Sequence, residues 1–400
     1  MKTFIGLSLC LLCLSCAGSK TMALLKQGQT QAEAFYNEIP FQYVNDHIFI
    51  KVEIEGRAYN FLFDTGFPIS FIDDDLIPLV DYDPVLKTKI SGSSFKKHTA
   101  EFGSLSKITI DKIDFLDIGV GAEDLKYIND DYICENPVHG VIGANLLRNA
   151  KWQIDYQKQL IRFTNDLSKL NIDQEAIVLD MTPRQQGYGY CTLSLNLDGI
   201  EKDFVFDTGS AGSFTSGLDF WKEVETLEPD YITSFYGNEL AGKTLYPKYS
   251  ILINEIKIGD LAINNALLSL EKGVSSLIGN NFLKHYLVSI DWDHNQLYLS
   301  PISSPQALVL TGFELILQPQ YDSNKIIVGA KRSGTDYNEI PLGTQVLSIN
   351  DEDVSTYSQA QLCQFWRDQW PSITSNDQIT IKVAGVDEAL KLTKKQLLPK

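Results

Sequence analysis

The strongest constraint on the fold of this chain is a segment that occurs twice, far apart in the sequence. Residues 59–66 read Tyr-Asn-Phe-Leu-Phe-Asp-Thr-Gly, and residues 202–209 read Lys-Asp-Phe-Val-Phe-Asp-Thr-Gly. Gly56 and Gly199 each stand eight residues before the aspartate of their copy, after apolar residues spaced by two. That spacing places side chains on one face of a strand, and an acidic residue followed by glycine is a turn signal. Each copy therefore predicts a β-hairpin whose second strand ends in Asp-Thr-Gly.

A second pair of matching segments closes each half of the repeat. Residues 138–145 read Val-His-Gly-Val-Ile-Gly-Ala-Asn, and residues 274–281 read Val-Ser-Ser-Leu-Ile-Gly-Asn-Asn. Both continue through a short helical stretch into two strands separated by a turn. Two segments of the same order and similar size indicate a duplication around an approximate two-fold axis. We therefore expect a first half over residues 36–168 and a second half over residues 169–302.

Two carboxyl groups that lie side by side have a definite chemistry. Amide hydrolysis needs a base that takes a proton from water and an acid that protonates the carbonyl oxygen. Two ionised carboxylates about 3 Å apart repel each other by roughly 5 kcal/mol at an effective dielectric constant of about 20. One member of such a pair therefore keeps its proton, so two adjacent aspartates can supply both the base and the acid.

With these motifs the chain resembles the aspartic peptidases of the retropepsin and pepsin type, over nearly all of residues 40–300. The resemblance implies a mainly β, bilobal acid-protease fold with two retropepsin-like β-barrel lobes. It implies that Asp64 and Asp207 are catalytic, and that the protein is an endopeptidase acting on peptides or proteins without a metal or cofactor. The residues that it assigns to support this pair are Thr65, Gly66, Thr208, Gly209, Ser210, Ile142, Gly143, Ile278 and Gly279. Because one chain supplies both lobes, a monomer is expected.

The same resemblance implies a mobile flap over the cleft. The hairpin near residues 89–95 has a Ser-Gly-Ser tip that suits a lid. The flap candidates are Ser91, Gly92 and Phe95, the last in place of the family's flap tyrosine. The matching element of the second half is expected near residues 235–242.

The two Asp-Thr-Gly copies differ in the residue that follows them. Ser210 follows the second copy, as in pepsin-like enzymes, whereas Phe67 follows the first, where the family has Ser or Ala. This departure keeps an alternative open, in which the chain is a catalytically inactive pseudo-peptidase that holds extended peptides without cleaving them. Retention of both Asp-Thr-Gly copies argues against that alternative.

After residue 302 the pattern changes, and we refer to residues 303–400 as the C-terminal region. A Gly-Phe pair at residues 312–313 is followed by a strand at residues 326–328 and by a Leu-Gly … Ile-Asn segment over residues 342–350. A helix over residues 357–366 and a strand over residues 378–383 come next. This order resembles a PDZ domain, which implies a C-terminal peptide as ligand. The alternative is a small α/β cap with no ligand.

Composition excludes some classes of partner. The formal net charge of −17 repels phosphate backbones, so nucleic acid is not expected as a partner. The five histidines are scattered and form no nucleophile pattern. Residues 73–75 are three aspartates without calcium-loop spacing, which favours a solvated turn over a metal site.

The N-terminus resembles a bacterial lipoprotein signal. A lysine is followed by an apolar stretch over residues 4–14, too short to span a bilayer, and then by Ser15-Cys16. We expect a signal peptide over residues 1–15, lipidation of Cys16 and a flexible tether over residues 16–35. This predicts a membrane-anchored, exported lipoprotein of a Gram-negative bacterium, in the periplasm or at the outer membrane. Plain signal-peptidase cleavage near Ala17 remains an alternative.

If Cys16 is lipidated, three widely spaced cysteines remain in the mature chain. Their spacing matches neither a disulfide framework nor a set of metal ligands. We therefore expect Cys134, Cys191 and Cys363 to be buried and to pack as small hydrophobic side chains.

The lipidation site gives the first testable prediction. Replacing Cys16 with serine removes the sulfur that carries the lipid, so the protein should move from the membrane fraction to the soluble periplasmic fraction. Fractionation and mass spectrometry of the mature N-terminus measure this. An unmodified wild-type N-terminus at Ala17 or Gly18 would contradict it.

Overall fold

The computed structural model describes most of the chain beyond its N-terminal segment. The described residues are 18–91, 97–125, 128, 134, 137–220, 231–237, 244–271, 273–303, 310–332, 337 and 339–398. The signal peptide over residues 1–15, the lipidation site Cys16 and the flap candidates Gly92 and Phe95 lie outside the described residues.

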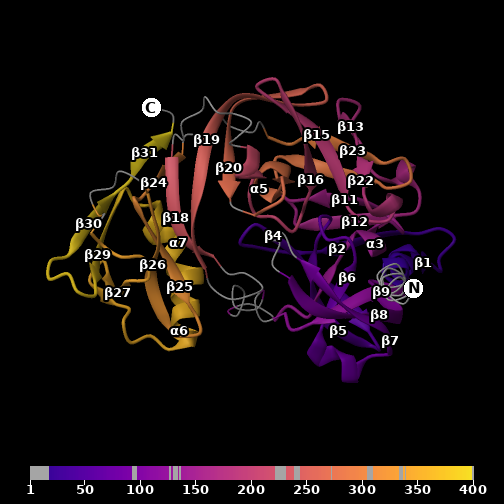
Figure 1. Cartoon of the computed structure of the whole chain (residues 1–400), viewed down its shortest axis with the longest axis horizontal. Helices are drawn as coiled ribbons and strands as arrows, with labels where there is room; N and C mark the ends of the chain where they lie inside the picture. The colour runs from indigo at the N-terminus through magenta and orange to yellow at the C-terminus, as the bar shows by residue number, and fades with distance from the viewer. Residues whose placement is uncertain are drawn as a thin grey trace, which may run out of the picture.

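The prediction of a mainly β protein is confirmed, and the strands of the two halves follow one another in the same order (Figure 1). The first half contains β2 (Tyr36–Pro40), β3 (Gln42–Val44), β4 (His47–Ile54), β5 (Arg57–Phe63), β6 (Ser70–Asp73), η1 (Asp74–Leu79), β7 (Tyr82–Ser91), β8 (Lys97–Ile110), β9 (Ile113–Glu123), β10 (Gly140–Ile142), α3 (Ala144–Leu147), β11 (Lys151–Asp155), β12 (Leu160–Thr164) and η2 (Leu167–Lys169). The second half contains β13 (Ile177–Asp180), β14 (Thr182–Pro183), η3 (Gln185–Gly187), β15 (Cys191–Leu197), β16 (Ile200–Phe206), β17 (Phe214–Gly217), β18 (Tyr231–Gly237), β19 (Thr244–Ile258), β20 (Leu261–Glu271), β21 (Leu277–Ile278), α5 (Asn280–Leu283), β22 (Tyr286–Asp291) and β23 (Gln296–Pro301).

The two predicted hairpins form where the repeat places them. Strand β4 pairs with β5 through a turn at Glu55 and Gly56, and β15 pairs with β16 through a turn at Asp198 and Gly199. The φ angles of these four residues are 51°, 72°, 48° and 93°. Two consecutive residues with positive φ make the tight turn whose twist matches a β-hairpin, and glycine adopts that conformation at little cost.

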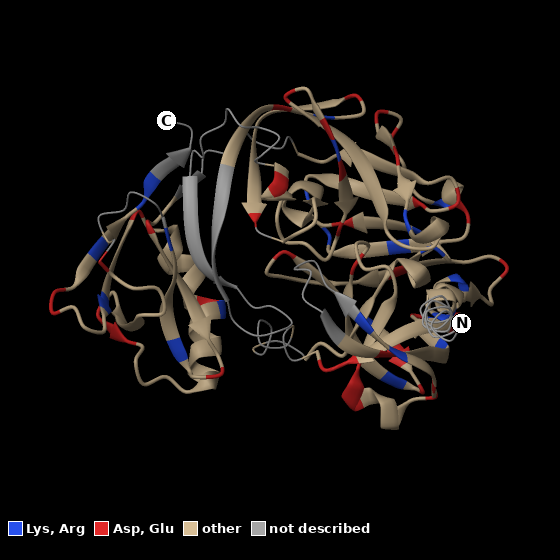
Figure 2. Cartoon of the chain, in the orientation of Figure 1, with Lys and Arg blue, Asp and Glu red and all other residues tan. Residues whose placement is uncertain are grey.

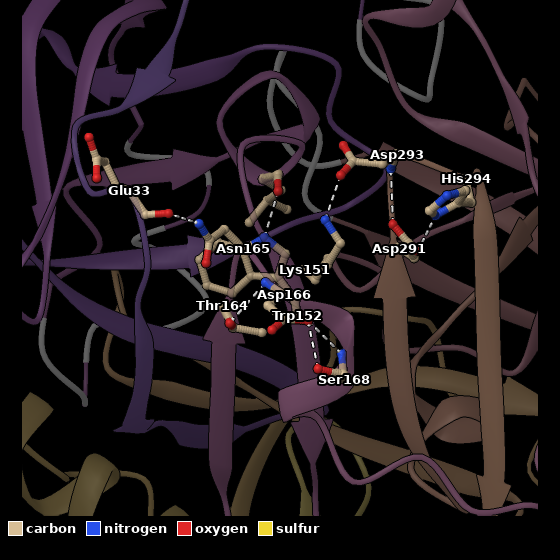
Figure 3. A network of polar contacts seen from close by, with 11 residues as sticks. Glu33, Lys151, Trp152, Thr164, Asn165, Asp166, Ser168, Asp291, Asp293 and His294 are labelled. Carbon is tan, nitrogen blue, oxygen red and sulfur yellow. Dashed lines mark hydrogen bonds and ion pairs between the residues drawn. The ribbon is translucent and has the colours of Figure 1, made fainter.

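The two halves share one sheet. Its strand order, β13-β23-β22-β11-β12-β2, places β11 of the first half directly beside β22 of the second. Apolar residues on both sides are fully buried, among them Trp152 and Ile290, which are partners across this pairing. Figure 3 shows Lys151 reaching from β11 to Asp293 in the turn after β22, with Nζ 2.5 Å from Oδ2. We call this the joining sheet, because it fixes the two halves relative to each other.

The segment predicted to be a flexible tether packs on the first half instead. Residues 18–26 are helical, and Leu24 and Leu25 are buried. Strand β1 (Gln29–Thr30) pairs with β9. The tether prediction is therefore wrong for residues 18–35, because burial of these leucines stabilises a fixed position that the polar composition of the segment did not indicate. None of the described helices combines the length and apolarity needed to cross a membrane.

The C-terminal region has its own apolar core but continues a sheet of the second half. Its elements are β24 (Leu310–Gly312), β25 (Leu315–Gln320), β26 (Lys325–Arg332), β27 (Gln345–Ile349), β28 (Glu352–Asp353), α6 (Gln359–Gln364), the π-helical turn η4 (Phe365–Gln369), α7 (Trp370–Ser375), β29 (Gln378–Val383), β30 (Leu390–Thr393) and β31 (Lys395–Leu398). The predicted strand over residues 378–383 is confirmed, and the predicted helix extends beyond residue 366 to Ser375. Strand β26 pairs antiparallel with β18, so the second half and the C-terminal region share backbone hydrogen bonds (Figure 1).

A disulfide bond also attaches the C-terminal region to the first half. Cys134, in the segment between β9 and β10, is bonded to Cys363 of α6, and their Cα atoms are 5.2 Å apart. The expectation of small buried hydrophobic side chains is therefore wrong for Cys134 and Cys363. It is confirmed for Cys191, which is buried with a free thiol. The two cysteines are 229 residues apart and come from different parts of the fold, so their spacing carried no signal of the bond.

The disulfide gives the second prediction. Replacing either Cys134 or Cys363 with serine should lower the free energy of unfolding by roughly 3 to 5 kcal/mol, because the bond restricts a long loop in the unfolded chain. The double variant should lose no more than either single variant, since one bond is removed in each case. Denaturant unfolding measures the loss, and peptide mapping without reductant should recover the two cysteines in one linked fragment. Alkylation of Cys134 in the native, unreduced protein would contradict the bond.

Candidate functional site

The two Asp-Thr-Gly loops lie at equivalent ends of equivalent strands. Asp64 follows β5, and its N–H donates to the carbonyl of Ile142 in β10 at 3.0 Å. Asp207 follows β16, and its N–H donates to the carbonyl of Ile278 in β21 at the same distance. Both neighbouring strands run parallel to the strand that delivers the aspartate. Each carboxyl group therefore starts from a backbone that is fixed on one side by the Ile-Gly segment of its own half.

Two threonines hold the loops against each other through a reciprocal set of hydrogen bonds. The N–H of Thr65 donates to Oγ1 of Thr208 at 3.0 Å, and the N–H of Thr208 donates to Oγ1 of Thr65 at 3.0 Å. Each hydroxyl then donates to a strand of the opposite half, Thr65 to the carbonyl of Phe206 and Thr208 to the carbonyl of Phe63, both at 2.8 Å. Both threonines are fully buried, so leaving any of these groups without a partner would be costly.

The glycine of each loop makes room for the aspartate of the other. A Cβ atom on Gly66 would lie 2.5 Å from Cγ of Asp207, and one on Gly209 would lie 2.2 Å from Oδ2 of Asp64. No side chain fits at such distances. The two carboxyl groups approach within hydrogen-bonding distance of each other only because residues 66 and 209 are glycines.

Burial and mutual proximity set the protonation of the pair. Desolvation raises the pKa of Asp64 to about 6, although hydrogen bonds from the carboxyl of Asp207 and from the N–H groups of Gly66 and Phe67 act in the opposite direction. Desolvation raises the pKa of Asp207 well above its usual value, and the negative charge of Asp64 raises it further. Asp64 Oδ1 accepts two backbone N–H groups and Asp207 Oδ1 accepts one, so Asp64 is the better stabilised anion and Asp207 is the carboxyl expected to keep the proton that the pair shares.

The Ile-Gly segments lie directly behind the loops. Ala144 N donates to the carbonyl of Phe67, and Asn280 N donates to the carbonyl of Ser210, both at 2.8 Å. A Cβ atom on Gly143 would lie 2.8 Å from Phe67 O, and one on Gly279 would lie 2.4 Å from Ser210 O. The structure therefore brings every supporting residue predicted from the sequence to the two aspartates or to the backbone beside them.

The residues after the two motifs differ in their surroundings. The N–H of Phe67 donates to Oδ1 of Asp64 at 3.0 Å, while its ring packs edge-on against Phe71 with centroids 5.2 Å apart. Its side chain therefore belongs to an apolar cluster of the first half rather than to the carboxyl pair. In the hydrogen bonds of the described residues, Ser210 takes part through its backbone, with its N–H donating to Asp207 O at 3.3 Å.

The sequence did not single out several residues that hold this site in place. Asn145 Oδ1 accepts from the N–H and hydroxyl of Ser70 at 2.7 and 3.0 Å, and that hydroxyl accepts from Gly143 N at 3.0 Å. His47 hydrogen-bonds to the carbonyl of Asn45 at 2.8 Å and to the backbone of Gly209, and burial lowers the pKa of its imidazole. The repeated Asn of residues 145 and 281 was the available signal for Asn145.

Asn280 is a further residue that the sequence did not single out. Its side-chain amide donates to the carbonyls of Thr208 and Asp46, both at 2.7 Å. The equivalent residue of the first half is Ala144. The difference between Asn280 and Ala144 was the available signal for this residue.

The hairpin predicted as a flap is formed by β7 and β8, and Ser91 is the last residue of β7. Strands β18 and β19 form the matching hairpin of the second half.

Away from the site, Asp73, Asp74 and Asp75 bring their carboxylates close enough for one metal ion. Both oxygens of Asp73, however, already accept N–H groups, from Asp75 and from Leu125. Acidic residues are spread over the loops and strands of the molecule, with Lys and Arg between them (Figure 2).

No family model matches the chain, and no curated protein matches it either.

The threonine hydrogen bonds give the third prediction. Thr65→Val keeps the shape of the side chain but leaves Thr208 N–H without its acceptor and Phe206 O without its donor. We expect the free energy of unfolding to fall by about 2 to 4 kcal/mol, because two buried groups lose their partners. Thr65→Ser keeps the hydroxyl and is the matched control. Equal stability of the valine and serine variants in urea unfolding would show that these hydrogen bonds do not hold the loops.

Proposed function

We propose that this protein is an aspartic endopeptidase, with Asp64 and Asp207 as its catalytic pair. The observation that supports this best is the pair itself: two desolvated carboxyl groups within hydrogen-bonding distance, Asp64 buried and Asp207 partly buried, which retain one proton between them. Placing two acids in a buried site costs stability, since desolvation disfavours the charged form. Strongly perturbed pKa values of this kind cluster at catalytic sites.

The proposed reaction uses the pair as base and acid together. Asp64, ionised, takes a proton from a water molecule held between the carboxyl groups, while Asp207 gives its proton to the oxygen of the peptide carbonyl. The water oxygen bonds to the carbonyl carbon and forms a tetrahedral intermediate. The proton now on Asp64 moves to the leaving nitrogen, the C–N bond breaks, and the hydroxyl proton of the intermediate returns to Asp207. Protons balance over the cycle, and no metal or cofactor takes part.

The rest of the proposal follows the organisation of the chain. The two halves serve as the lobes of a bilobal acid-protease fold that takes an extended peptide or protein segment between them, and β7 and β8 provide the flap. The C-terminal region is proposed as a PDZ-like domain with a peptide ligand. One chain supplies the complete pair, so we propose a monomer.

We also propose export and membrane anchoring through lipidated Cys16, in the periplasm or at the outer membrane. The disulfide between Cys134 and Cys363 supports export, because such bonds persist in oxidising compartments.

The fourth prediction tests the catalytic pair. Asp64→Asn and Asp207→Asn should each abolish hydrolysis of a peptide library, and the double variant should lose nothing further, because the pair acts as one unit. The raised pKa values mean that the native state binds more protons than the unfolded chain between about pH 4 and neutrality. Stability of the parent should therefore fall as pH rises through that window, and the double variant should lose this dependence. Unfolding followed by circular dichroism at several pH values measures this pH dependence of the stability.

The same experiment separates the peptidase from the inactive alternative. Full hydrolysis by either single variant would exclude Asp64 and Asp207 as the catalytic pair. Absence of hydrolysis by the parent, together with saturable binding of extended peptides, would support a peptide-binding pseudo-peptidase. A statine-type inhibitor, which places a hydroxyl between the carboxyl groups, is the control for specific inhibition.

A further inference from the structure

The two catalytic loops are not supported alike. Asn280, the first residue of α5, donates from its side-chain Nδ2 to the carbonyl of Thr208 at 2.7 Å and to the carbonyl of Asp46 at 2.7 Å. Its Oδ1 accepts from the hydroxyl of Tyr156 at 2.7 Å. Asn280 is completely buried, and Tyr156 is nearly so. The amide therefore has a partner for its oxygen and two for its nitrogen, in a site closed to water.

The orientation of this amide follows from its partners. A carbonyl oxygen can only accept, so the NH₂ group of Asn280 must face Thr208 and Asp46. Its oxygen then faces Tyr156, whose hydroxyl has to donate. Desolvation raises the pKa of Tyr156 well above its usual value, so the hydroxyl keeps the proton that it donates.

The carbonyl of Thr208 belongs to the same peptide group as the N–H of Gly209. That N–H donates to Oδ1 of Asp207 at 2.8 Å. The hydrogen bonds therefore form one continuous chain, from the hydroxyl of Tyr156 through the amide of Asn280 and the Thr208–Gly209 peptide to the carboxyl of Asp207. Each bond in such a chain polarises the next group and strengthens the following bond.

The first half has no equivalent of this chain. The residue at the position of Asn280 is Ala144, which has no polar side chain. The residue at the position of Tyr156 is Trp292, whose indole can only donate and whose buried Nε1 has no hydrogen-bond partner in the described part of the chain. Asp64 instead accepts two N–H groups on Oδ1, from Gly66 and Phe67.

We propose that Tyr156 and Asn280 are positioning residues for Asp207, acting through the Thr208–Gly209 peptide to strengthen the hydrogen bond that Gly209 donates to its carboxyl group. The chain crosses from the first half to the second, because Tyr156 follows β11 and Asn280 begins α5. It therefore couples the contact between the halves to the acidity of one catalytic carboxyl. The consequence for catalysis rests on the proposed peptidase activity, whereas the effect on the carboxyl does not.

The direction of the effect can be worked out from the bond to Gly209. A donor to the ionised carboxylate stabilises the charged form, and Gly209 N–H acts in this way on Asp207. Weakening that bond therefore raises the pKa of Asp207. Since Asp207 holds the shared proton, its loss defines the basic limb of the pH–rate profile. The acidic limb reports protonation of Asp64, to which neither Asn280 nor Tyr156 is hydrogen-bonded.

Other ionisable groups around the loop have to be separated from this effect. Asp64, after β5, and His47, at the start of β4, contact the loop itself. Tyr43 and Lys284 contact Asp46, whose carbonyl accepts from Asn280. Burial lowers the pKa of His47, so its titration is moved away from the basic limb. Lys284 contacts Asp46 Oδ1 at 3.2 Å and so shares the contact between the halves without entering the chain.

The test compares three variants. Asn280→Ala installs the residue that the first half already carries, Tyr156→Phe removes only the hydroxyl, and Lys284→Ala removes a neighbouring contact between the halves. Asn280→Ala should raise the pH at which Asp207 loses its proton by about half a unit, from the loss of polarisation of one charge-assisted hydrogen bond. Tyr156→Phe should give a smaller shift in the same direction, and Lys284→Ala should give none.

Two readouts keep this inference apart from the proposed function. The first is the titration of aspartate carboxyl carbons by ¹³C NMR, with the Asp207 signal identified by its absence in Asp207→Asn. The second is the pH–rate profile, in which the basic limb should move upward while the acidic limb stays. A carboxyl shift in a protein that cleaves no peptide supports the hydrogen-bond chain and contradicts the peptidase proposal. An unchanged titration in Asn280→Ala, or an equal shift in Lys284→Ala, overturns the chain.

Discussion

The structure depends on four hydrogen bonds that Thr65 and Thr208 make across the interface between the halves, two to each other and two to the carbonyls of Phe206 and Phe63. These bonds are buried, and in each of them one half supplies the partner that a group in the other half's loop needs. Their strength holds two acidic groups within reach of each other, although burial and mutual repulsion both oppose that arrangement. The joining sheet contributes to this, because the pairing of β11 with β22 fixes the two halves relative to each other.

Duplication explains the symmetry of these bonds, and its departures explain how the two carboxyls come to differ. Both aspartates end equivalent strands and rest on equivalent Ile-Gly segments. Asp64 accepts two backbone N–H groups, whereas Asp207 accepts one and lies beside the negative charge of its partner. Acid and base chemistry requires the two groups to hold different protonation states. A difference of one backbone hydrogen bond between the two repeated halves therefore helps to give the two carboxyl groups different pKa values.

The parts of this arrangement that repeat in the sequence could be predicted, and the parts that occur once could not. The hairpins before Asp64 and Asp207 were visible because turn glycines and strand periodicity are local signals. The disulfide of Cys134, the pairing of β18 with β26 and the packing of Leu24 join segments that are distant in sequence or lie in polar surroundings. Such contacts depend on the three-dimensional fold and leave no periodic pattern.

The C-terminal region makes the two long hairpins unequal. Strand β18 of the second half is bonded along its outer edge to β26, whereas β7 of the first half is an edge strand among the described residues. Moving β18 would break backbone hydrogen bonds to another folded core, while moving β7 and β8 would not. In the proposed peptidase, opening of the site to substrate therefore falls to the hairpin of the first half. The disulfide between Cys134 and Cys363 attaches the C-terminal region to that half through the segment between β9 and β10, which is outside the β7–β8 hairpin.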